Sequence, residues 1–347
     1  MVQPALKMSE LGYRTKVSFD YADVNDLSYD VYHFQRITQP SALKAMEFLK
    51  ENGKVIMMDM DDDLFNLYPG HPSSWYFRSG KECFKCHYTR INPVEIKCPK
   101  CGGTKLEYQD RLGICGEALH LVDLLTVTTD ELKANFGGLA KNCTIIPNYV
   151  DMNIYNALPT KGDDYLAVGW AGSFTHTIDL TELVGWLGPI DRVDNAYFFA
   201  TGIDPTVLAQ KFTDGFSHKD KLVLLDPVEL QEYPYLLTNF DIGLAPLVDN
   251  LFNRSKSPLK AIEYGAVGIP VIASDVGPYA KYVEHGKTGF LVKKQRDWSK
   301  YIGLLINDKE LREEMGRANY MKSMTMDINR HIHERIAIYE AYAAGGE

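Results

Sequence analysis

The sequence predicts an α/β protein with two Rossmann-like, doubly wound domains, each built on a parallel sheet that helices cover. Three observations support this fold class. The chain has 347 residues, which suits two ordinary domains of about 100–200 residues each. Strand-like and helix-like segments alternate in two series that separate near residue 150. The strand-like segments are continuously apolar, as strands are when both faces of their sheet are buried.

The first series predicts an N-terminal domain at residues 1–150. Apolar periodicity, Gly53 as a helix stop and the break at Pro147 define its elements. In chain order we predict strand 31–34, helix 40–52, strand 54–58, helix 117–125, strand 126–128, helix 130–136 and strand 144–146.

The second series predicts a C-terminal domain at residues 151–328. In chain order we predict strand 166–170, helix 180–187, strands 197–200 and 222–225, helix 229–237, strand 242–245, helix 258–264 and strand 271–273. Residues 329–347 form a separate terminal segment, in which Ile332, Ile336 and Tyr339 recur at helical spacing.

Composition excludes some classes of protein. The formal net charge is −9, which disfavours an overall basic nucleic-acid binder. No apolar run approaches the roughly 18–20 residues of a membrane span. The N-terminal sequence lacks the basic start and apolar stretch of a signal peptide. We therefore expect a cytoplasmic protein without a membrane span, and the sequence leaves its oligomeric state open.

Four of the six cysteines form two CxxC pairs with eleven residues between them. Each pair lets two thiolates reach one ion from a tight knuckle, and two knuckles complete a tetrahedral four-sulfur zinc site. Redox CxxC pairs are the alternative, but these normally occur singly and open a helix. Four protein ligands leave no open position, so the zinc is expected to be structural. The ligands are Cys83, Cys86, Cys98 and Cys101.

The cysteine segment, residues 81–106, is predicted to be a zinc ribbon inserted in the N-terminal domain. It is the most basic part of an acidic chain, with basic side chains at Lys81, Lys85, His87, Arg90, Lys97, Lys100 and Lys105. Cys115 and Cys143 stand alone and are expected to be small buried apolar residues.

Two loops of the second domain carry polar groups where strands end. Residues 169–180 read GWAGSFTHTIDL, with Gly172, Ser173 and His176 at a strand–helix turn. Residues 253–274 read NRSKSPLKAIEYGAVGIPVIAS. There Ser257 is predicted as a helix N-cap with Pro258 at the first helical position. The helix start, Lys256 and Lys260 predict an anion pocket, and the Glu263 carboxylate can accept two hydrogen bonds from a ribose diol. Solvated surface charges are the alternative.

These stretches resemble GT-B glycosyltransferases of the group 1, mostly retaining type. The similar segments are GWAGSFTH (169–176), DIGLAPL (241–247), KSPLKAIEYGAVGIPVIAS (256–274), EHGKTGFLV (284–292), TVTTDEL (126–132) and IIPNYVD (145–151). MMDMDDDLF (57–65) resembles a segment of phage and bacterial members.

The resemblance implies a nucleotide-sugar donor, most simply a UDP-sugar, on the C-terminal domain, and no catalytic metal. It implies that Glu263 binds the donor ribose and that Lys256, Ser257 and Pro258 hold the diphosphate. The donor site implied also includes Gly172, Ser173, Pro227, Val228, Asn253 and Lys260. His176 would face the phosphates or the sugar and is a candidate catalytic residue. It further implies that the C-terminal helix crosses back to the N-terminal domain.

The sequence departs from the family pattern at three places. The family has two glutamates separated by seven residues, and Ser255 stands at the first position. The usual arginine and lysine of the first C-domain loop are missing from 169–180. The N-terminal glycine-rich loop is not recognisable either. These departures leave the sugar and the stereochemical outcome open.

An aspartate cluster follows the strand at 54–58. Asp61 or Asp63 is a candidate catalytic base for an acceptor hydroxyl. A metal–diphosphate site and a helix cap in a solvated loop are the alternatives. Arg36 follows another strand and is a candidate for binding acceptor or phosphate; an ordinary surface arginine is the alternative.

Three function hypotheses remain at this stage. One is transfer to hydroxymethylated pyrimidine in phage DNA, which the basic cysteine segment favours and the net charge opposes. Under this DNA hypothesis, the acceptor is bound by Lys85, Arg90 and Lys97. Another is transfer to a cell-surface or lipid-linked glycan in a bacterial or phage-infected cell. The third is a catalytically inactive protein that binds sugar nucleotides or acts as a scaffold.

Overall fold

The computed structural model describes residues 2–83, 85–86, 91–92, 94–156, 161–162, 164–202, 219–229 and 231–345. Packing divides the chain into two compact units. The N-terminal unit comprises Met1–Pro147 and Ile332–Glu347, and the C-terminal unit comprises Asn148–His331. The last helix, α15 (Ile328–Ala343), begins in the C-terminal unit, and most of its length belongs to the N-terminal unit.

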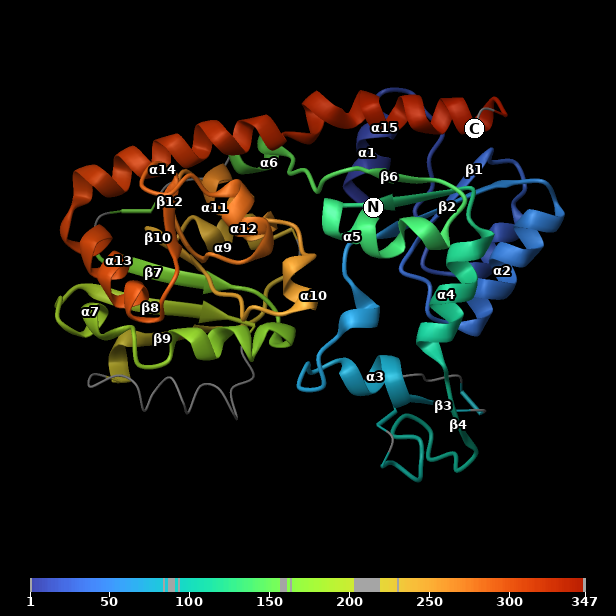
Figure 1. Cartoon of the computed structure of the whole chain (residues 1–347), viewed down its shortest axis with the longest axis horizontal. Helices are drawn as coiled ribbons and strands as arrows, with labels where there is room; N and C mark the ends of the chain where they lie inside the picture. Colours follow the sequence, from blue (N-terminus) through green and yellow to red (C-terminus); the bar gives the residue numbers. More distant parts are fainter. Residues whose placement is uncertain are drawn as a thin grey trace. The chain divides into compact units, whose positions relative to one another are not determined.

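The N-terminal unit contains a parallel sheet of order β1-β2-β5-β6 (Figure 1). Its elements are α1 (Val2–Glu10), η1 (Tyr21–Asn25), β1 (Val31–Gln35), α2 (Pro40–Glu51), β2 (Val55–Met60), η2 (Leu64–Asn66), α3 (Ser74–Ser79), β3 (Lys81–Cys83), β4 (Leu106–Tyr108), α4 (Arg111–Leu121), β5 (Leu124–Val127), α5 (Asp130–Phe136), η3 (Gly137–Leu139) and β6 (Cys143–Ile145). The apolar residues of β2 and α2 are buried together, so this sheet has a core of its own.

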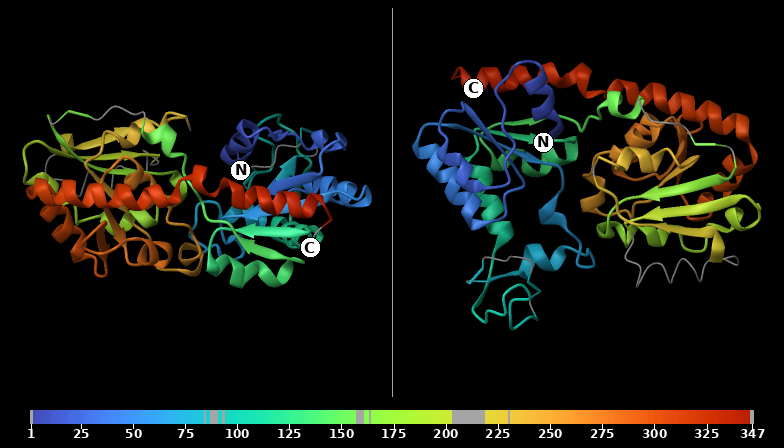
Figure 2. Two further views of the ribbon diagram at one scale, coloured as in Figure 1. Left: turned by 90° about the horizontal axis from the view of Figure 1, so that it is seen from above. Right: turned by 180° about the vertical axis from the view of Figure 1, so that it is seen from behind.

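The cysteine segment lies outside that sheet. Antiparallel strands β3 and β4 enclose it, and Figure 1 shows it beyond the ends of α3 and α4, away from β1 and β2. The second view in Figure 2 shows the same separation. The segment is thus built as an appendage to the N-terminal unit.

The C-terminal unit contains a six-stranded parallel sheet of order β12-β11-β10-β7-β8-β9. Its elements are α6 (Met152–Asn156), β7 (Leu166–Ala171), η4 (Phe174–His176), η5 (Asp179–Leu183), α7 (Gly188–Asp191), β8 (Ala196–Thr201), η6 (Lys219–Lys221), β9 (Leu222–Leu225), α9 (Tyr233–Leu237), β10 (Ile242–Ala245), α10 (Leu251–Arg254), α11 (Leu259–Ala266), β11 (Val271–Ser274), α12 (Gly277–Tyr282), β12 (Gly289–Val292), α13 (Arg296–Asn307), α14 (Lys309–Ser323) and η7 (Met324–Met326).

Both faces of the six-stranded sheet are buried. Alternate residues of β7 enter two different cores, because successive side chains of a strand point to opposite faces. Val168 and Trp170 pack with residues of α13 on one face. Ala167 and Ala171 pack with residues of α9 and α11 on the other face. The predicted fold class, α/β with two parallel sheets, is therefore confirmed.

The predicted helix 229–237 is shorter in the structure, where α9 begins at Tyr233. Two other predicted helices differ more. The predicted helix 117–125 ends at Leu121, because Leu124 and Leu125 are buried in β5 between β2 and β6. The predicted helix 180–187 is instead the short helix η5, and Gly185 follows with a positive φ of 84°. Tertiary packing overrides local propensity at both places. Among the residues that the structure describes, no helix has the length and apolarity needed to cross a bilayer.

Candidate functional site

The C-terminal sheet has a topological switch point between β7 and β10. From β7 the chain adds β8 and β9 on one side, and β10 then returns to the other side of β7. In open parallel sheets, ligands bind beyond the carboxyl ends of the strands at such a point. A ligand site is therefore expected at the loops that follow β7 and β10.

Two glycines let the neighbouring loops approach each other closely. A Cβ at Gly172, after β7, would lie 2.5 Å from the Trp170 ring and 3.0 Å from Lys260 Nζ. Gly202, after β8, has a φ of 74°, and a Cβ there would overlap the carbonyl of Gly172. Only glycine fits both requirements at Gly202. The missing side chains thus leave room for the Trp170 ring, Lys260 Nζ and the backbone of the two loops to approach one another.

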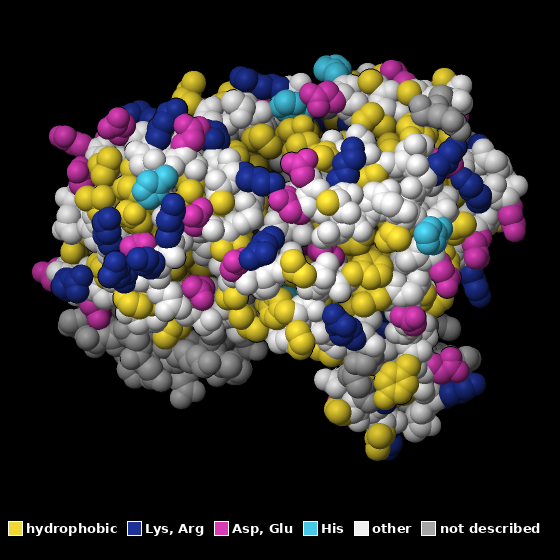
Figure 3. Space-filling view, viewed as in Figure 1, with side chains coloured by type: hydrophobic (Ala, Val, Ile, Leu, Met, Phe, Trp, Pro, Cys, Tyr) yellow, Lys and Arg dark blue, Asp and Glu magenta, His cyan; other side chains and the backbone are white. Residues whose placement is uncertain are grey.

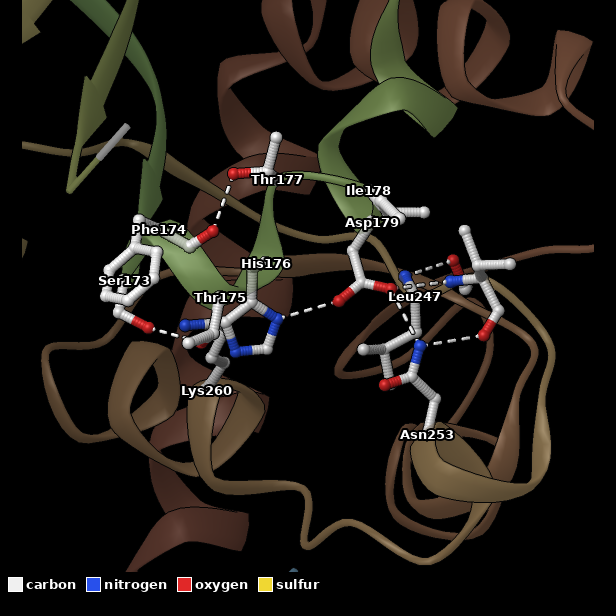
Figure 4. Close-up of polar contacts among 12 residues, drawn as sticks. Ser173, Phe174, Thr175, His176, Thr177, Ile178, Asp179, Leu247, Asn253 and Lys260 are labelled. Atoms are coloured by element: carbon white, nitrogen blue, oxygen red, sulfur yellow. Dashed lines mark hydrogen bonds and ion pairs between the residues drawn. The ribbon is translucent and has the colours of Figure 1, made fainter. Parts of the chain in front are cut away.

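A buried polar network joins the loops on the two sides of the switch point (Figure 4). His176 Nδ1 lies 2.8 Å from Asp179 Oδ2. The other oxygen, Asp179 Oδ1, accepts hydrogen bonds from the Val248 amide at 3.0 Å and from Asn253 Nδ2 at 2.7 Å. Asp179 is 1% exposed and Asn253 is fully buried. The network holds His176 at the end of β7 against the loop that follows β10.

The charge state of His176 follows from its surroundings. Burial lowers the pKa of His176 to about 4, although the hydrogen bond to Asp179 opposes this. The positive charges of Lys260 and Lys256 lower it further, so both ammonium groups are close enough to act on the ring. The imidazole is consequently neutral at physiological pH.

Helix α11 contributes a cation and a carboxylate on one face, because positions three apart on a helix are neighbours. Lys260 Nζ donates to the Ala171 carbonyl at 2.6 Å, and Tyr233 donates its hydroxyl hydrogen to Glu263 Oε2 at 3.0 Å. Burial lowers the pKa of Lys260 to about 8 and raises the pKa of Glu263 to about 7. A polar ligand bound to both groups would offset part of the free-energy cost of their desolvation.

The start of α11 differs by one residue from the prediction. Pro258 is the N-cap and the helix begins at Leu259. Ser257 precedes the N-cap and does not cap the helix; its hydroxyl accepts a hydrogen bond from Asn148 Nδ2 at 2.9 Å. Lys256 precedes this start, with its ammonium 4.8 Å from the centre of the Phe252 ring. Ser255, at the position of the family's first glutamate, is buried and donates to the Leu251 carbonyl.

The remaining predicted donor residues lie on exposed loops of the same unit. Ser173 is exposed, and its hydroxyl lies 2.6 Å from that of Thr175. Pro227 and Val228 follow β9, which is the edge strand two positions from β7. The structure thus brings together Gly172, His176, Asn253, Lys256, Lys260 and Glu263, and it places Pro227 and Val228 toward the sheet edge.

A second polar cluster lies at the carboxyl ends of β1 and β2 in the N-terminal unit. Arg36 pairs with Asp62 at 2.7 Å and with Asp61 at 3.4 Å. Its backbone adopts a positive φ of 46°, which is unusual for a residue other than glycine. Burial raises the pKa of Asp61 to about 6, against the effect of Arg36, and the charges of Asp62 and Asp59 also raise it. A carboxylate with that pKa is suited to accept a proton near neutral pH.

Asp59 and Asp63 have different surroundings. Asp59 Oδ1 accepts a hydrogen bond from Thr126 on the neighbouring strand at 2.6 Å. Asp63 is fully buried and caps η2, and its Oδ2 also accepts from Asn66 and Asn135 at 2.8 and 2.7 Å. These contacts match the helix-cap interpretation of Asp63.

The four CxxC cysteines form a candidate metal centre. Their sulfur atoms all lie within 4.8 Å of one another, and the Cys83–Cys101 and Cys86–Cys98 pairs are each 3.6 Å apart. Tetrahedral coordination with Zn–S bonds of about 2.3 Å requires sulfur atoms about 3.8 Å apart, so the spacing fits. Burial raises the pKa of the Cys83 thiol, but the amides of Cys86 and Lys85 and the neighbouring thiols outweigh this and lower it to about 7.

The other predictions for the cysteines and for the basic side chains have mixed outcomes. Cys115 is fully buried, and burial raises the pKa of its thiol to about 12, as expected for an inert core residue. Cys143 is only partly buried. Lys85 and Lys97 are exposed on the cysteine segment, whereas Arg90 and His87 lie outside the described residues.

Apolar side chains also reach the surface of the cysteine segment. Val94 is 81% exposed and Ile96 is 78% exposed. Figure 3 shows apolar atoms on the exterior of this appendage, with basic (Lys or Arg) and acidic side chains beside them. The described surface of the segment is therefore both basic and apolar.

Sequence reasoning missed two functional candidates. Asp179 stands three residues after His176, a spacing that allows contact across one helical turn and was the available signal. Tyr233 lies 30 positions before Glu263, and no local pattern connects the two. The contacts of Asp179 with Val248 and Asn253, and of Tyr233 with Glu263, form only when the sheet brings separate segments together.

The fold is that of an α/β protein of the GT-B type, and polar groups of separate loops gather at the switch point of its second sheet. Comparison with known families agrees with this class. The sequence model of the glycosyl transferases group 1 matches residues 219–322. That segment contains Lys256, Lys260 and Glu263.

Curated relatives align over a similar region. A D-inositol 3-phosphate glycosyltransferase of Pseudarthrobacter chlorophenolicus is 30% identical over 113 residues, which is 32% of this chain and 26% of the relative. Spore coat protein SA of Bacillus subtilis is 26% identical over 110 residues, which is 30% of this chain and 28% of that protein. The chain therefore spans about a quarter of the length of these curated relatives.

Solved structures are similar over most of the chain. Sucrose-phosphate synthase from Thermosynechococcus elongatus has a TM-score of 0.64 at 15% identity, covering 94% of this chain and 76% of that chain. HepE of Anabaena, in complex with UDP, has a TM-score of 0.64 at 15% identity, covering 93% and 82%. At such identity the likeness shows the fold.

Proposed function

We propose that the protein is a glycosyltransferase that moves a sugar from a nucleoside diphosphate sugar, with a UDP-sugar as the first choice, to an acceptor hydroxyl. The observation that carries this proposal is the cluster of Lys256, Lys260 and Glu263 beside the switch point of the C-terminal sheet. The group 1 match covers these residues, and the Anabaena HepE structures hold UDP or UDP-glucose.

In this proposal the donor diphosphate lies at the start of α11. The first amides of a helix have no partner within the helix, and helix polarity favours an anion there by about 0.3–1 kcal/mol. Lys256 and Lys260 add two formal charges and contribute more than that. They neutralise the diphosphate as the bond to the sugar breaks, so the leaving group needs no metal ion. Glu263 accepts two hydrogen bonds from the ribose diol, and Tyr233 holds its carboxylate in place.

The remaining donor roles are assigned along the loops. Gly172 and Ser173 lie beside the phosphates or the sugar, and His176 contacts the sugar. Pro227 and Val228 lie nearest the base, at the side of the sheet where β9 ends.

Asp61 is the proposed catalytic base on the acceptor side, and Arg36 orients it. A retaining enzyme needs no dedicated base, because the donor phosphate itself can take the proton, so the pH dependence of transfer distinguishes the two mechanisms. Asp63 remains in the proposal as a supporting residue that shapes the loop through its cap.

We also propose that Cys83, Cys86, Cys98 and Cys101 bind one structural zinc ion. The spacing of the sulfur atoms and the glycine turns of the knuckles support this assignment. Gly102 has a φ of 69°, and a Cβ at Gly103 would lie 3.2 Å from Cys83 Sγ. The ion would tie β3 and β4 to a segment whose buried cluster is Cys83, Ile91 and Cys98.

The acceptor proposal depends on the cysteine segment, where Lys85 and Lys97 are exposed. A polyanionic acceptor such as hydroxymethylpyrimidine-modified DNA fits these charges, and its use would fall steeply with salt. A cell-surface or lipid-linked glycan is the second candidate, which the exposed Val94 and Ile96 favour. Product formation on modified DNA, unmodified DNA and glycan acceptors at two salt concentrations separates the candidates.

The test of the whole proposal is a donor screen by thermal shift, followed by assays of nucleotide release and transfer. We expect UDP-sugars to raise the Tm, and Lys256→Ala with Lys260→Ala to abolish the shift. Lys287→Ala, an exposed lysine of the same unit, is the matched control. Binding without any sugar release indicates an inactive sugar-nucleotide-binding protein. No binding of any nucleotide sugar contradicts the proposal.

A further inference from the structure

The polar network around His176 has a consequence for ligand recognition, which rests on the donor site proposed above. His176 is partly exposed, while its partner Asp179 is buried at the junction of three segments: η5, the loop after β10 and α10. Figure 4 shows that the ring bonds to Asp179 through one nitrogen only. The partners of Asp179 determine whether the other nitrogen, Nε2, donates or accepts a hydrogen bond.

Asp179 is fixed as an acceptor by its other partners. The Val248 amide and the Asn253 side-chain NH₂ can only donate, and both donate to Oδ1. Asn253 is itself anchored, because its Nδ2 also donates to the Val248 carbonyl at 2.9 Å and its own amide is capped by Asn250. A carboxylate held in this way presents Oδ2 to His176 as an acceptor, so Nδ1 of the imidazole carries the hydrogen.

A neutral imidazole has one N–H and one lone pair. With the hydrogen on Nδ1, the lone pair is on Nε2, which can accept a hydrogen bond but cannot donate one. Lys256 and Lys260 act on the ring from α11 and the segment before it, and Trp170 packs edge-on against it from β7. The two positive charges and burial oppose protonation of the ring, and Asp179 favours it.

We propose that Asp179 and Asn253 are positioning residues that fix His176 in the Nδ1–H tautomer, so that Nε2 accepts a hydrogen bond from a hydroxyl of the transferred sugar. Two kinds of group in the site would thereby bind different parts of the donor. Lys256 and Lys260 bind the anionic diphosphate, and His176 recognises a neutral hydroxyl. A phosphate oxygen is a poor partner for Nε2, since both atoms are acceptors.

The first experiment reads the tautomer in the unmodified protein. Proton–nitrogen correlation spectra of protein with labelled histidine distinguish Nδ1–H from Nε2–H, and the spectrum of His176→Gln identifies the signal of His176. We expect a hydrogen on Nδ1 and a bare Nε2 at neutral pH. A hydrogen on Nε2, or on both nitrogens, overturns the proposal.

The second experiment compares the affinities of UDP and UDP-glucose by calorimetry. His176→Ala and Asp179→Asn are expected to weaken UDP-glucose binding about fivefold to tenfold, the worth of one hydrogen bond, and to change UDP binding less than about twofold. Asparagine at 179 still accepts from Val248 but offers an N–H to Nδ1, so the hydrogen moves to Nε2. His176→Gln, whose carbonyl can replace Nε2 as an acceptor, should restore much of the selectivity.

Asp249→Asn is the matched control, because Asp249 lies in the same loop but is exposed and pairs with Arg254. Equal losses for UDP and UDP-glucose in His176→Ala would make His176 a phosphate ligand and overturn the hydroxyl assignment. No loss for either would remove His176 from the site. If unmodified protein binds neither compound, the proposed function itself fails, and the tautomer measurement still tests the network. Should Asp179→Asn not fold, His176→Ala and the spectra decide the question.

Discussion

The carboxyl ends of the two parallel sheets carry opposite chemistry. In the C-terminal unit, Lys256 and Lys260 lie beside a neutral imidazole, and the strand order reverses between β7 and β10. In the N-terminal unit, Asp61 and Asp62 follow β2. The described strands of that sheet are ordered β1-β2-β5-β6, so their order in the sheet follows their order in the chain. One sheet end therefore carries two cations beside a neutral ring, whereas the other is acidic and partly neutralised by Arg36.

Under the proposed function, this contrast separates the places where the donor and the acceptor would gain binding energy. An anionic ligand meets positive charge and helix amides in the C-terminal unit, and would meet carboxylates at the sheet end of the N-terminal unit. A neutral hydroxyl has the opposite preference, because a carboxylate with a raised pKa can take its proton. The cysteine segment is a third region, whose described core is small and whose surface is basic.

The largest expected effect concerns metal removal, because the two sheets have cores of their own, whereas the described core of the cysteine segment is built around only Cys83, Ile91 and Cys98. Four-cysteine zinc sites contribute on the order of 10 kcal/mol to folding. Chelation or Cys98→Ser should release one zinc ion, seen by elemental analysis, and make the cysteine segment sensitive to protease. The sheets should keep their circular dichroism.

Cys143→Ser is the matched control for that experiment, since Cys143 lies outside the sulfur cluster. A protein that contains no zinc before chelation, or that keeps its zinc in Cys98→Ser, would exclude the proposed centre.

The next effect concerns the acidic sheet end, where neighbouring aspartates differ in role. Asp61→Asn should reduce transfer by about 10²–10⁴-fold, the usual worth of a general base, and leave donor binding intact. In the unmodified protein the rate should rise as pH increases through about 6, because Asp61 must be deprotonated to act. Measuring kcat against pH, with donor hydrolysis assayed separately, tests this.

Asp63→Asn is the paired comparison for Asp61→Asn. Asparagine can still cap η2, but its NH₂ cannot accept the hydrogen bonds that Asn66 and Asn135 donate to Asp63 Oδ2. The substitution should therefore lower the free energy of unfolding by about 1–3 kcal/mol with a small effect on transfer. Normal transfer by Asp61→Asn across the pH range would remove the base and favour proton transfer to the donor phosphate.

How far the sequence predicts the molecule depends on the range of the interactions. The parallel strands were predictable because their burial is encoded in local apolar runs such as 242–245, which is β10. The grouping of Lys256, Lys260 and Glu263 was predictable because one helix and its approach carry them. Similarly, the cysteine cluster follows from the spacing of the knuckles.

What escaped prediction depends on contacts between distant segments. Asp179 gains its role from Val248 and Asn253, about seventy positions away. Asp61 and Asp63 look alike in the sequence, and only their partners Arg36 and Asn135 distinguish them. Short helices such as η5 were misassigned because packing rather than propensity sets their form.

A smaller effect is expected at Glu263, where one substitution should weaken UDP binding and raise the stability of the protein at pH 8. Glu263→Gln should weaken UDP binding about 10–100-fold, because it loses hydrogen bonds to a charged acceptor worth about 1.5–3 kcal/mol. Burial raises the pKa of Glu263 from 4.5 to about 7, so the folded state binds more protons than the unfolded state between these values. Stability should therefore fall as pH rises from about 4.5 to 7.

The glutamine variant removes that dependence. It should be more stable than the unmodified protein at pH 8, by about 1–3 kcal/mol, and not at pH 4. Denaturant unfolding at the two pH values, with calorimetry for UDP, measures both effects. Unchanged UDP affinity would move the ribose site away from α11.

The smallest expected effect is on acceptor binding by the exposed lysines of the cysteine segment, which lies apart from both sheet ends. Lys85→Glu and Lys97→Glu each change one exposed charge, so each should raise the acceptor KM by a factor of only about two to five. The donor KM should not change, because donor groups lie on α11 and its neighbours. Lys44→Glu, an exposed charge reversal on α2, controls for net charge.

With a polyanionic acceptor, Lys85→Glu and Lys97→Glu should also flatten the salt dependence of transfer, since fewer counterions are displaced. Equal effects of all three variants would mean that net charge alone matters and would reduce the cysteine segment to a stabilising element, whereas an effect confined to Lys85 and Lys97 would make it part of the acceptor site.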